Sequence, residues 1–132
     1  MDFLRFWKKL ENQPETKPGT APASEIPLFS SLGPAELKLV EGKMRRVEYK
    51  AGELVYLAGE EPEAFYIIHS GRFRIVNPRG ETITILSQGD YFGESSILLG
   101  RRHSASVEAK NGGILFKIDK KDFQILRGFI GS

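Results

Sequence analysis

The most informative stretch of this sequence reads GDYFGESSILL from Gly89 to Leu99 and RRHSASV from Arg101 to Val107. Its residues predict a turn, a short helix that begins at Gly93-Glu94, a basic loop and then a strand. The first N–H groups of a helix lack partners within the helix, and the helix dipole favours negative charge beside them. We therefore expect an anion-binding site at the start of this helix.

The side chains around the predicted helix start add a second chemistry. Gly93 lets a ligand approach the backbone closely. Glu94 is a fixed acceptor for sugar hydroxyls. The loop that follows carries Arg101, Arg102 and His103, whose side chains are of the types that recognise phosphate or carboxylate. Anion donors beside a hydroxyl acceptor predict a site for a phosphorylated sugar.

This stretch resembles the phosphate-binding cassette of the cyclic nucleotide-binding domain family, of catabolite-activator and protein-kinase-A-regulatory type. Phe92-Gly93-Glu94 matches the family's Phe-Gly-Glu, Ser96 its small position, and Ser104-Ala105 the pair after its arginine. Ser95 stands where Leu or Ile is common, and His103 replaces the phosphate-binding arginine. The resemblance implies the following ligand-binding residues: Phe92, Gly93, Glu94, Ser95, Ser96, Arg102, His103, Ser104 and Ala105.

The resemblance extends upstream and covers about residues 26 to 126. Residues 50–60 look like the family's second strand, residues 65–75 like its hairpin of the form Tyr-x-Ile-x-x-Gly-x-x-x-Ile, and residues 26–32 like its initial turn. The resemblance implies a regulatory domain in signal transduction rather than an enzyme. Cyclic AMP or cyclic GMP is the implied ligand, and no other cofactor is implied.

Residues 43–118 also predict a fold by themselves, because apolar and polar residues alternate in short segments separated by turns. Such patterning indicates antiparallel strands. We expect a mainly-β fold, an antiparallel β-roll or jelly-roll barrel of about eight strands, with the cassette helix and N- and C-terminal helices. Asn77-Pro78-Arg79-Gly80 predicts one hairpin turn.

The chain divides near residue 25 into a short N-terminal part and a domain of residues 26–132. Residues 1–11 predict an amphipathic helix, and residues 12–25 a Pro-rich linker. The helix either contacts a membrane surface or partner, or packs on its own domain, and its shortness favours the second alternative. The domain is expected to begin with a helix over residues 34–42. It is expected to close with a helix after Asp119 that carries Phe123, Leu126 and Ile130 on one face.

Composition narrows the functional classes. The 132 residues contain 40% hydrophobic and 27% charged residues, with a net charge of +2 and no cysteine. These values indicate one globular domain without a disulfide framework, thiolate metal site or large basic field, and we expect a cytoplasmic protein. No helix-turn-helix follows the domain, so we expect no specific DNA binding by this chain. We expect a protein partner or a covalently linked effector domain instead.

Three functions remain open at this point. The first is a sensor of a cyclic nucleotide or another small phosphorylated ligand, bound weakly because His103 is mostly neutral. Arg102 could replace the missing charge only if the loop shifts, since neighbours in a strand point to opposite faces. The second is a degenerate copy that acts as an interaction or scaffolding module, in which Glu94, the serines and the arginines are ordinary helix-start and surface residues. The third is a metal-dependent β-barrel enzyme using His69, His103 and Glu94, which the absence of a His-x-His pair disfavours.

Overall fold

The computed structural model describes residues 33–127, so the predicted helix of residues 1–11, the linker of residues 12–25 and Ile130 lie outside the described residues. Pro34 occupies the first turn of the first described helix, as its fixed backbone angle favours. The elements follow in the order α2 (Pro34–Lys43), β1 (Arg45–Tyr49), β2 (Leu54–Tyr56), β3 (Ala64–Val76), β4 (Thr82–Leu86), β5 (Tyr91–Phe92), α3 (Glu94–Leu99), β6 (Ser106–Asp119) and α4 (Lys120–Arg127).

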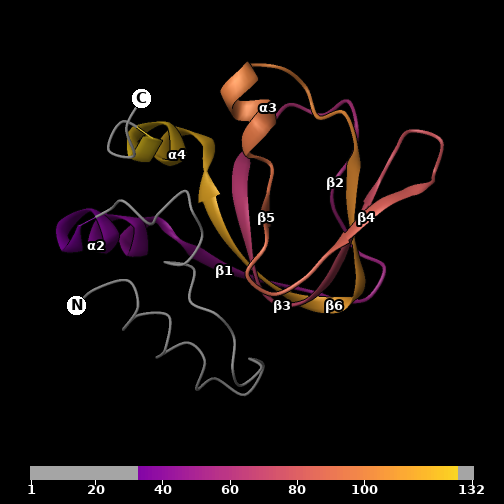
Figure 1. Ribbon diagram of the computed structural model, residues 1–132, viewed down its shortest axis with the longest axis horizontal. Helices are drawn as coiled ribbons and strands as arrows, with labels where there is room; N and C mark the ends of the chain where they lie inside the picture. Colours follow the sequence, from indigo (N-terminus) through magenta and orange to yellow (C-terminus); the bar gives the residue numbers. More distant parts are fainter. Residues whose placement is uncertain (1–32, 128–132) are drawn as a thin grey trace.

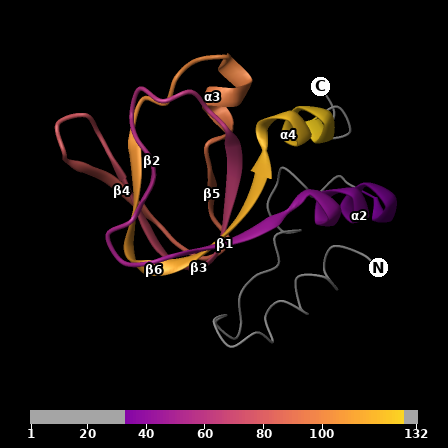
Figure 2. The same ribbon diagram turned by 180° about the vertical axis from the view of Figure 1, so that it is seen from behind.

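The strands form one antiparallel sheet in the order β1-β6-β3-β4, with β2 paired to β6 and β5 paired to β3. Figure 1 and the reverse view in Figure 2 show this sheet curling into a roll, with α3 at one rim and α2 and α4 side by side beyond one end. The predicted antiparallel β-roll with flanking helices is confirmed.

The described residues contain six strands rather than about eight, because two long strands each replace two predicted ones. β3 has 13 residues and β6 has 14, and they pair from Ala64 opposite Asp119 to Val76 opposite Ser106. The predicted hairpin of residues 65–75 is therefore wrong, since these residues form one strand. Gly71 has φ 85° and lies where β3 bends, and the register of β3 against β6 shifts between Ile68 and Ser70 and again between Gly71 and Phe73.

β3 is buried on both faces, which explains its nearly continuous apolar sequence. Phe65 and Ile67 belong to the core cluster under α2 and α4, and the Phe65 ring lies 4.8 Å from that of Phe123. Tyr66 alternates with them and belongs to the second cluster, inside the roll, where it stacks on Phe92. The predicted apolar face of the last helix is confirmed by the burial of Phe123 and Leu126.

The predicted turn at residues 77–80 joins β3 to β4. The N–H of Gly80 donates to the carbonyl of Asn77, and the N–H of Asn77 donates to the carbonyl of Glu81.

Within the described range, no helix has both the length and the apolar character needed to cross a bilayer.

Candidate ligand-binding pocket

The cassette adopts the predicted turn and short helix. β5 pairs with β3 through Tyr66 and Phe92, and the chain then turns at Gly93, whose φ is 92°. A Cβ atom at Gly93 would lie 3.0 Å from the carbonyl oxygen of Ala64, so glycine is required both by conformation and by space. α3 begins at Glu94, as the sequence predicts, but it has only six residues. Its dipole is therefore smaller than that of an ordinary helix.

A pocket of about 290 Å³ opens beside this turn, at the low end of the sizes of small-molecule sites. The cassette supplies one part of its wall, and β2 and the β3–β4 hairpin supply the rest. The lining residues are Tyr56, Ile75, Leu86, Tyr91, Phe92, Gly93, Glu94, Ser95, Ser96, His103, Ser104 and Ala105. Eight of the nine residues implied by the cassette thus lie together, and Arg102 is the exception.

Glu94 is the acidic residue of the pocket. Its Oε2 atom is buried and has no hydrogen-bond partner among the described residues. Burial raises the pKa of this carboxyl, and its own backbone N–H opposes the shift. Burial of Tyr56 raises the pKa of its own hydroxyl, and the nearby Glu94 carboxylate raises it further. The Glu94 carboxylate can therefore accept a further hydrogen bond from a ligand.

His103 is held in place on several sides. Its side chain is only 5% exposed, and Nδ1 lies 3.1 Å from the Oγ atom of Ser96. The imidazole stacks on the Tyr56 ring, with centroids 3.6 Å apart and planes 5° from parallel. Its backbone N–H donates to the carbonyl of Glu60, and its own carbonyl accepts from the N–H of Gly59. These contacts fix the imidazole as one wall of the pocket.

The charge state of His103 follows from this burial. Burial lowers the pKa of the imidazole below its ordinary value of 6.5, although the nearby Glu60 carboxylate opposes the shift. His103 is therefore neutral at pH 7, and it does not supply the charge of the arginine that it replaces.

Arg102 points away from the pocket. Its Nη1 donates to the carbonyl oxygen of Gly59 at 2.9 Å, and its Nη2 lies 3.0 Å from Oε1 of Glu61. The opposite directions of Arg102 and His103 agree with the sequence-based expectation. The reason differs, however, because β6 begins only at Ser106 and residues 101–103 form a loop.

The sequence did not predict four of the lining residues. Ile75 and Leu86 reach the pocket because β3 and β4 pair beside it, and Tyr91 directly precedes Phe92. The alternating pattern around Ile75 was a usable signal for an inward-facing side chain. Tyr56 carries no such signal, since its position depends on the pairing of β2 with Val107 in β6.

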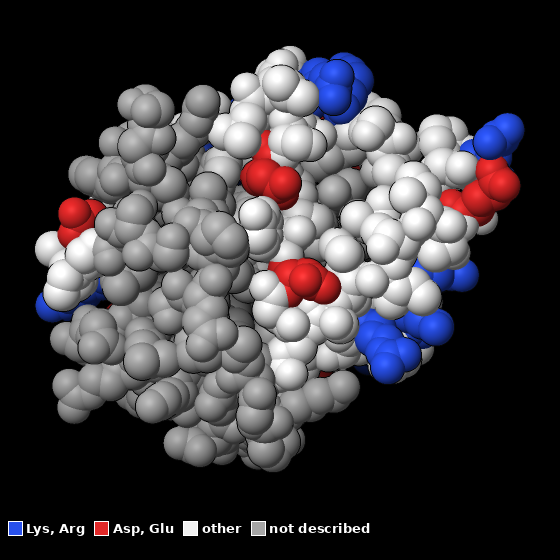
Figure 3. Space-filling model, in the orientation of Figure 1, with Lys and Arg blue, Asp and Glu red and all other residues white. Residues whose placement is uncertain are grey.

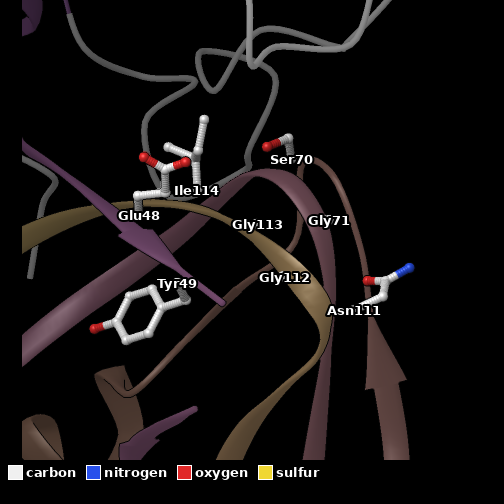
Figure 4. A pocket seen from close by; sticks show the side chains of 8 residues that line it. All are labelled: Glu48, Tyr49, Ser70, Gly71, Asn111, Gly112, Gly113 and Ile114. Carbon is white, nitrogen blue, oxygen red and sulfur yellow. The ribbon is translucent and has the colours of Figure 1, made fainter. Parts of the chain in front are cut away.

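A second hollow of about 360 Å³ lies where β3 and β6 bend. Figure 4 shows Glu48, Ser70 and Ile114 on one side of the strands, whereas the Tyr49 ring points to the other side. The floor of this hollow is glycine backbone at residues 112–113. Although it is larger than the cassette pocket, its polar side chains do not converge, so the cassette pocket is the better candidate site.

The residues of the possible metal site are not brought together. Glu94 and His103 line the cassette pocket, whereas His69 lies in β3 with its ring 4.9 Å from that of Phe116. Among the described residues, no group of three or more His, Asp or Glu side chains is placed to hold a metal ion.

Comparison with known proteins identifies the family. The family model described as "Cyclic nucleotide-binding domain" matches residues 46–127. The chain belongs to this family. The cyclic nucleotide-binding domain is 34% identical over 105 residues to the cAMP-dependent protein kinase regulatory subunit of Schizosaccharomyces pombe, covering 79% of this chain and 25% of that protein. It is 28% identical over 98 residues to an uncharacterised NTE family protein of Mycobacterium bovis, covering 74% and 17%.

Solved structures agree with this assignment. The domain superposes on the regulatory subunit of a cAMP-independent protein kinase A from Trypanosoma cruzi, which is bound to guanosine, with a TM-score of 0.76 and 27% identity. That match covers 82% of this chain and 40% of the other. The cyclic nucleotide-binding domain thus spans about a quarter of the yeast protein and two fifths of the trypanosome chain.

Proposed function

We propose that this cyclic nucleotide-binding domain senses a ribose-containing ligand, a cyclic nucleotide or a nucleoside, in the cassette pocket. Glu94 accepts hydrogen bonds from the ribose hydroxyls. The observation that carries the proposal is its Oε2 atom, which is buried and has no hydrogen-bond partner among residues 33–127. A buried acceptor without a partner destabilises a protein by about 1–3 kcal/mol, and a ligand hydroxyl removes that penalty.

The pocket is expected to bind a phosphate group more weakly than it binds a ribose. A hydrogen bond to a charged group contributes about 1.5–3 kcal/mol, and the neutral His103 offers at most one N–H donor without the positive charge and the paired donors of an arginine. A cyclic nucleotide should therefore bind about ten- to a hundredfold more weakly than to a pocket with arginine at this position. The guanosine complex of the trypanosome relative supports a ligand that does not depend on phosphate.

The domain acts through another protein or through a linked effector domain. Two of its relatives are regulatory subunits of cAMP-dependent protein kinase, and the matched region is only about a quarter of each. Binding in the pocket would regulate such an effector by favouring one arrangement of α3 and α4, and the domain itself would supply no catalytic group.

A second candidate function is an interaction module without a ligand. It is favoured by Leu98 and Leu99 of α3, whose side chains are 39% and 59% exposed beside the pocket rim. Exposed leucines on a short helix suit a protein partner. In this alternative, the stacked rings of Tyr56 and His103 would serve only to pack the interior and would not contact a ligand.

Titration calorimetry with cyclic AMP, cyclic GMP, adenosine and guanosine separates the two functions. The proposal predicts binding of at least one of them, weakened about tenfold or more by Glu94→Gln. Glu63→Gln, at an exposed position, is the matched control and should leave the affinity unchanged. No binding to the folded wild type, or binding that Glu94→Gln leaves unchanged, would contradict the proposal.

A further inference from the structure

The charges around the cassette pocket are the starting point. The lining includes one carboxylate, Glu94, and no lysine or arginine. His103 is neutral, and its Nδ1 is already engaged with Ser96. The Arg102 guanidinium is bound to the Gly59 carbonyl and paired with Glu61. The six-residue α3 adds only a small dipole. The wall of the pocket is therefore negative rather than positive at pH 7.

This charge distribution separates two ligands that share a ribose and a base. A 3′,5′-cyclic nucleotide brings a phosphodiester anion into a pocket that already holds the Glu94 carboxylate. Like charges in one small site repel each other, and no cation among the described lining residues offsets the repulsion. An uncharged nucleoside brings no such charge.

The hydroxyl chemistry favours the same ligand. In a cyclic nucleotide the 3′ oxygen is part of the phosphodiester ring, so only the 2′ hydroxyl can donate to a carboxylate. A nucleoside keeps both the 2′ and the 3′ hydroxyl, and a carboxylate accepts a pair of donors through its two oxygens. Ile75 and Leu86 provide an apolar wall for a flat base.

We infer that the cassette pocket selects an uncharged nucleoside over the matching cyclic nucleotide, through the Glu94 carboxylate and the absence of a lining cation. The inference rests on the proposed function, since it specifies the ligand of the same pocket. It makes His103 the residue that decides selectivity against the phosphate.

The test compares matched ligands on the intact chain by titration calorimetry at pH 8, where His103 is neutral. Guanosine should bind at least about tenfold tighter than cyclic GMP, and adenosine should exceed cyclic AMP in the same way. Removal of the 2′ or the 3′ hydroxyl should each weaken nucleoside binding about tenfold, because each loses one donor to Glu94. His103→Arg should shrink or reverse the preference for the nucleoside.

A cyclic nucleotide that binds wild type as tightly as its nucleoside at pH 8 would overturn this inference and leave the proposed function intact. The same holds if wild type binds cyclic GMP or cyclic AMP but neither nucleoside. If wild type that is folded by circular dichroism binds none of the four ligands, the proposed function fails together with the inference.

Discussion

At the scale of single residues, the Glu94 carboxylate lowers the stability of the ligand-free domain at neutral pH. Its Oε2 atom is buried without a partner among the described residues, and burial raises the pKa of its carboxyl above the ordinary 4.5. A raised carboxyl pKa means that the folded state holds its proton more tightly than the unfolded state. Its contribution to stability is therefore present below pH 4.5 and is lost as the pH rises through the folded-state pKa.

Glu94→Gln should accordingly stabilise the ligand-free protein at pH 7, by about 1 kcal/mol or a few degrees in Tm, because no charge is left to desolvate. The gain should vanish near pH 4, where the wild-type carboxyl is protonated. Thermal unfolding of both proteins at the two pH values checks this, with the exposed Glu63→Gln as control. A lower Tm at pH 7 would show that Glu94 has a structural partner instead.

His103 should make cyclic nucleotide binding depend on pH. Burial lowers its pKa in the free protein, whereas a bound anion raises it, so binding takes up a proton. Affinity should rise as the pH falls through the pKa of the complex. It should level off below the pKa of the free protein, which is under 6.5. Tyr56, Ser96 and Glu60 surround the imidazole, and among them Glu60 is the carboxylate that favours protonation.

Residue-level prediction from the sequence succeeded where the chain itself brings residues together. The turn at Gly93 and the short α3 place residues 92–96 in one wall, and the following loop brings back residues 103–105. Tyr56 could not be found in this way, because it reaches His103 only through the pairing of β2 with β6. Likewise, only the folded loop shows that the Arg102 guanidinium is bound to the Gly59 carbonyl.

At the scale of elements, the pairing of β3 with β6 holds the roll together. Gly71 lies opposite Gly113 where the two strands bend, and a Cβ atom at Gly71 would lie 2.6 Å from the Gly113 Cα and closer still to the Gly112 carbonyl. The alternating sequence predicts strands on both sides of Gly71, but a glycine between two strand patterns is compatible with either a turn or a bend. The sequence pattern therefore predicts the roll correctly but predicts about eight strands, where the described residues form six.

Gly71→Ala should destabilise the domain by at least about 3 kcal/mol, or more than about 10 °C in Tm, because both the positive φ and the clash oppose it. Gly80→Ala is the matched control. Gly80 also has a positive φ, of 84°, but no atom lies within 4 Å of its added Cβ, so the loss should be nearer 1 kcal/mol. Both free energies of unfolding can be measured by chemical denaturation. Equal destabilisation by the two variants would mean that β3 and β6 can move apart at Gly71 and accommodate the added methyl group.

At the scale of the whole molecule, the two apolar clusters on either side of β3 join the roll to its helices. One cluster links α2, α3 and α4, and the other contains Phe92 just before the pocket turn. α3, which borders the proposed pocket, is thus connected through packed side chains to α4. Figure 3 shows basic groups scattered around the described part of this face rather than gathered into one patch. The described part of this face therefore presents no continuous basic surface.

The central claim is that the cassette pocket remains a ribose-binding site that lacks only a cation for the phosphate. The most direct test is calorimetric titration of cyclic AMP into wild type and His103→Arg side by side, at pH 8 and pH 6. We predict about ten- to a hundredfold tighter binding by His103→Arg at pH 8, the contribution of one bidentate charge-assisted contact. The difference should narrow at pH 6, as His103 becomes protonated in the complex. A folded His103→Arg protein that binds no cyclic AMP at either pH would contradict the claim and make the interaction module the better account.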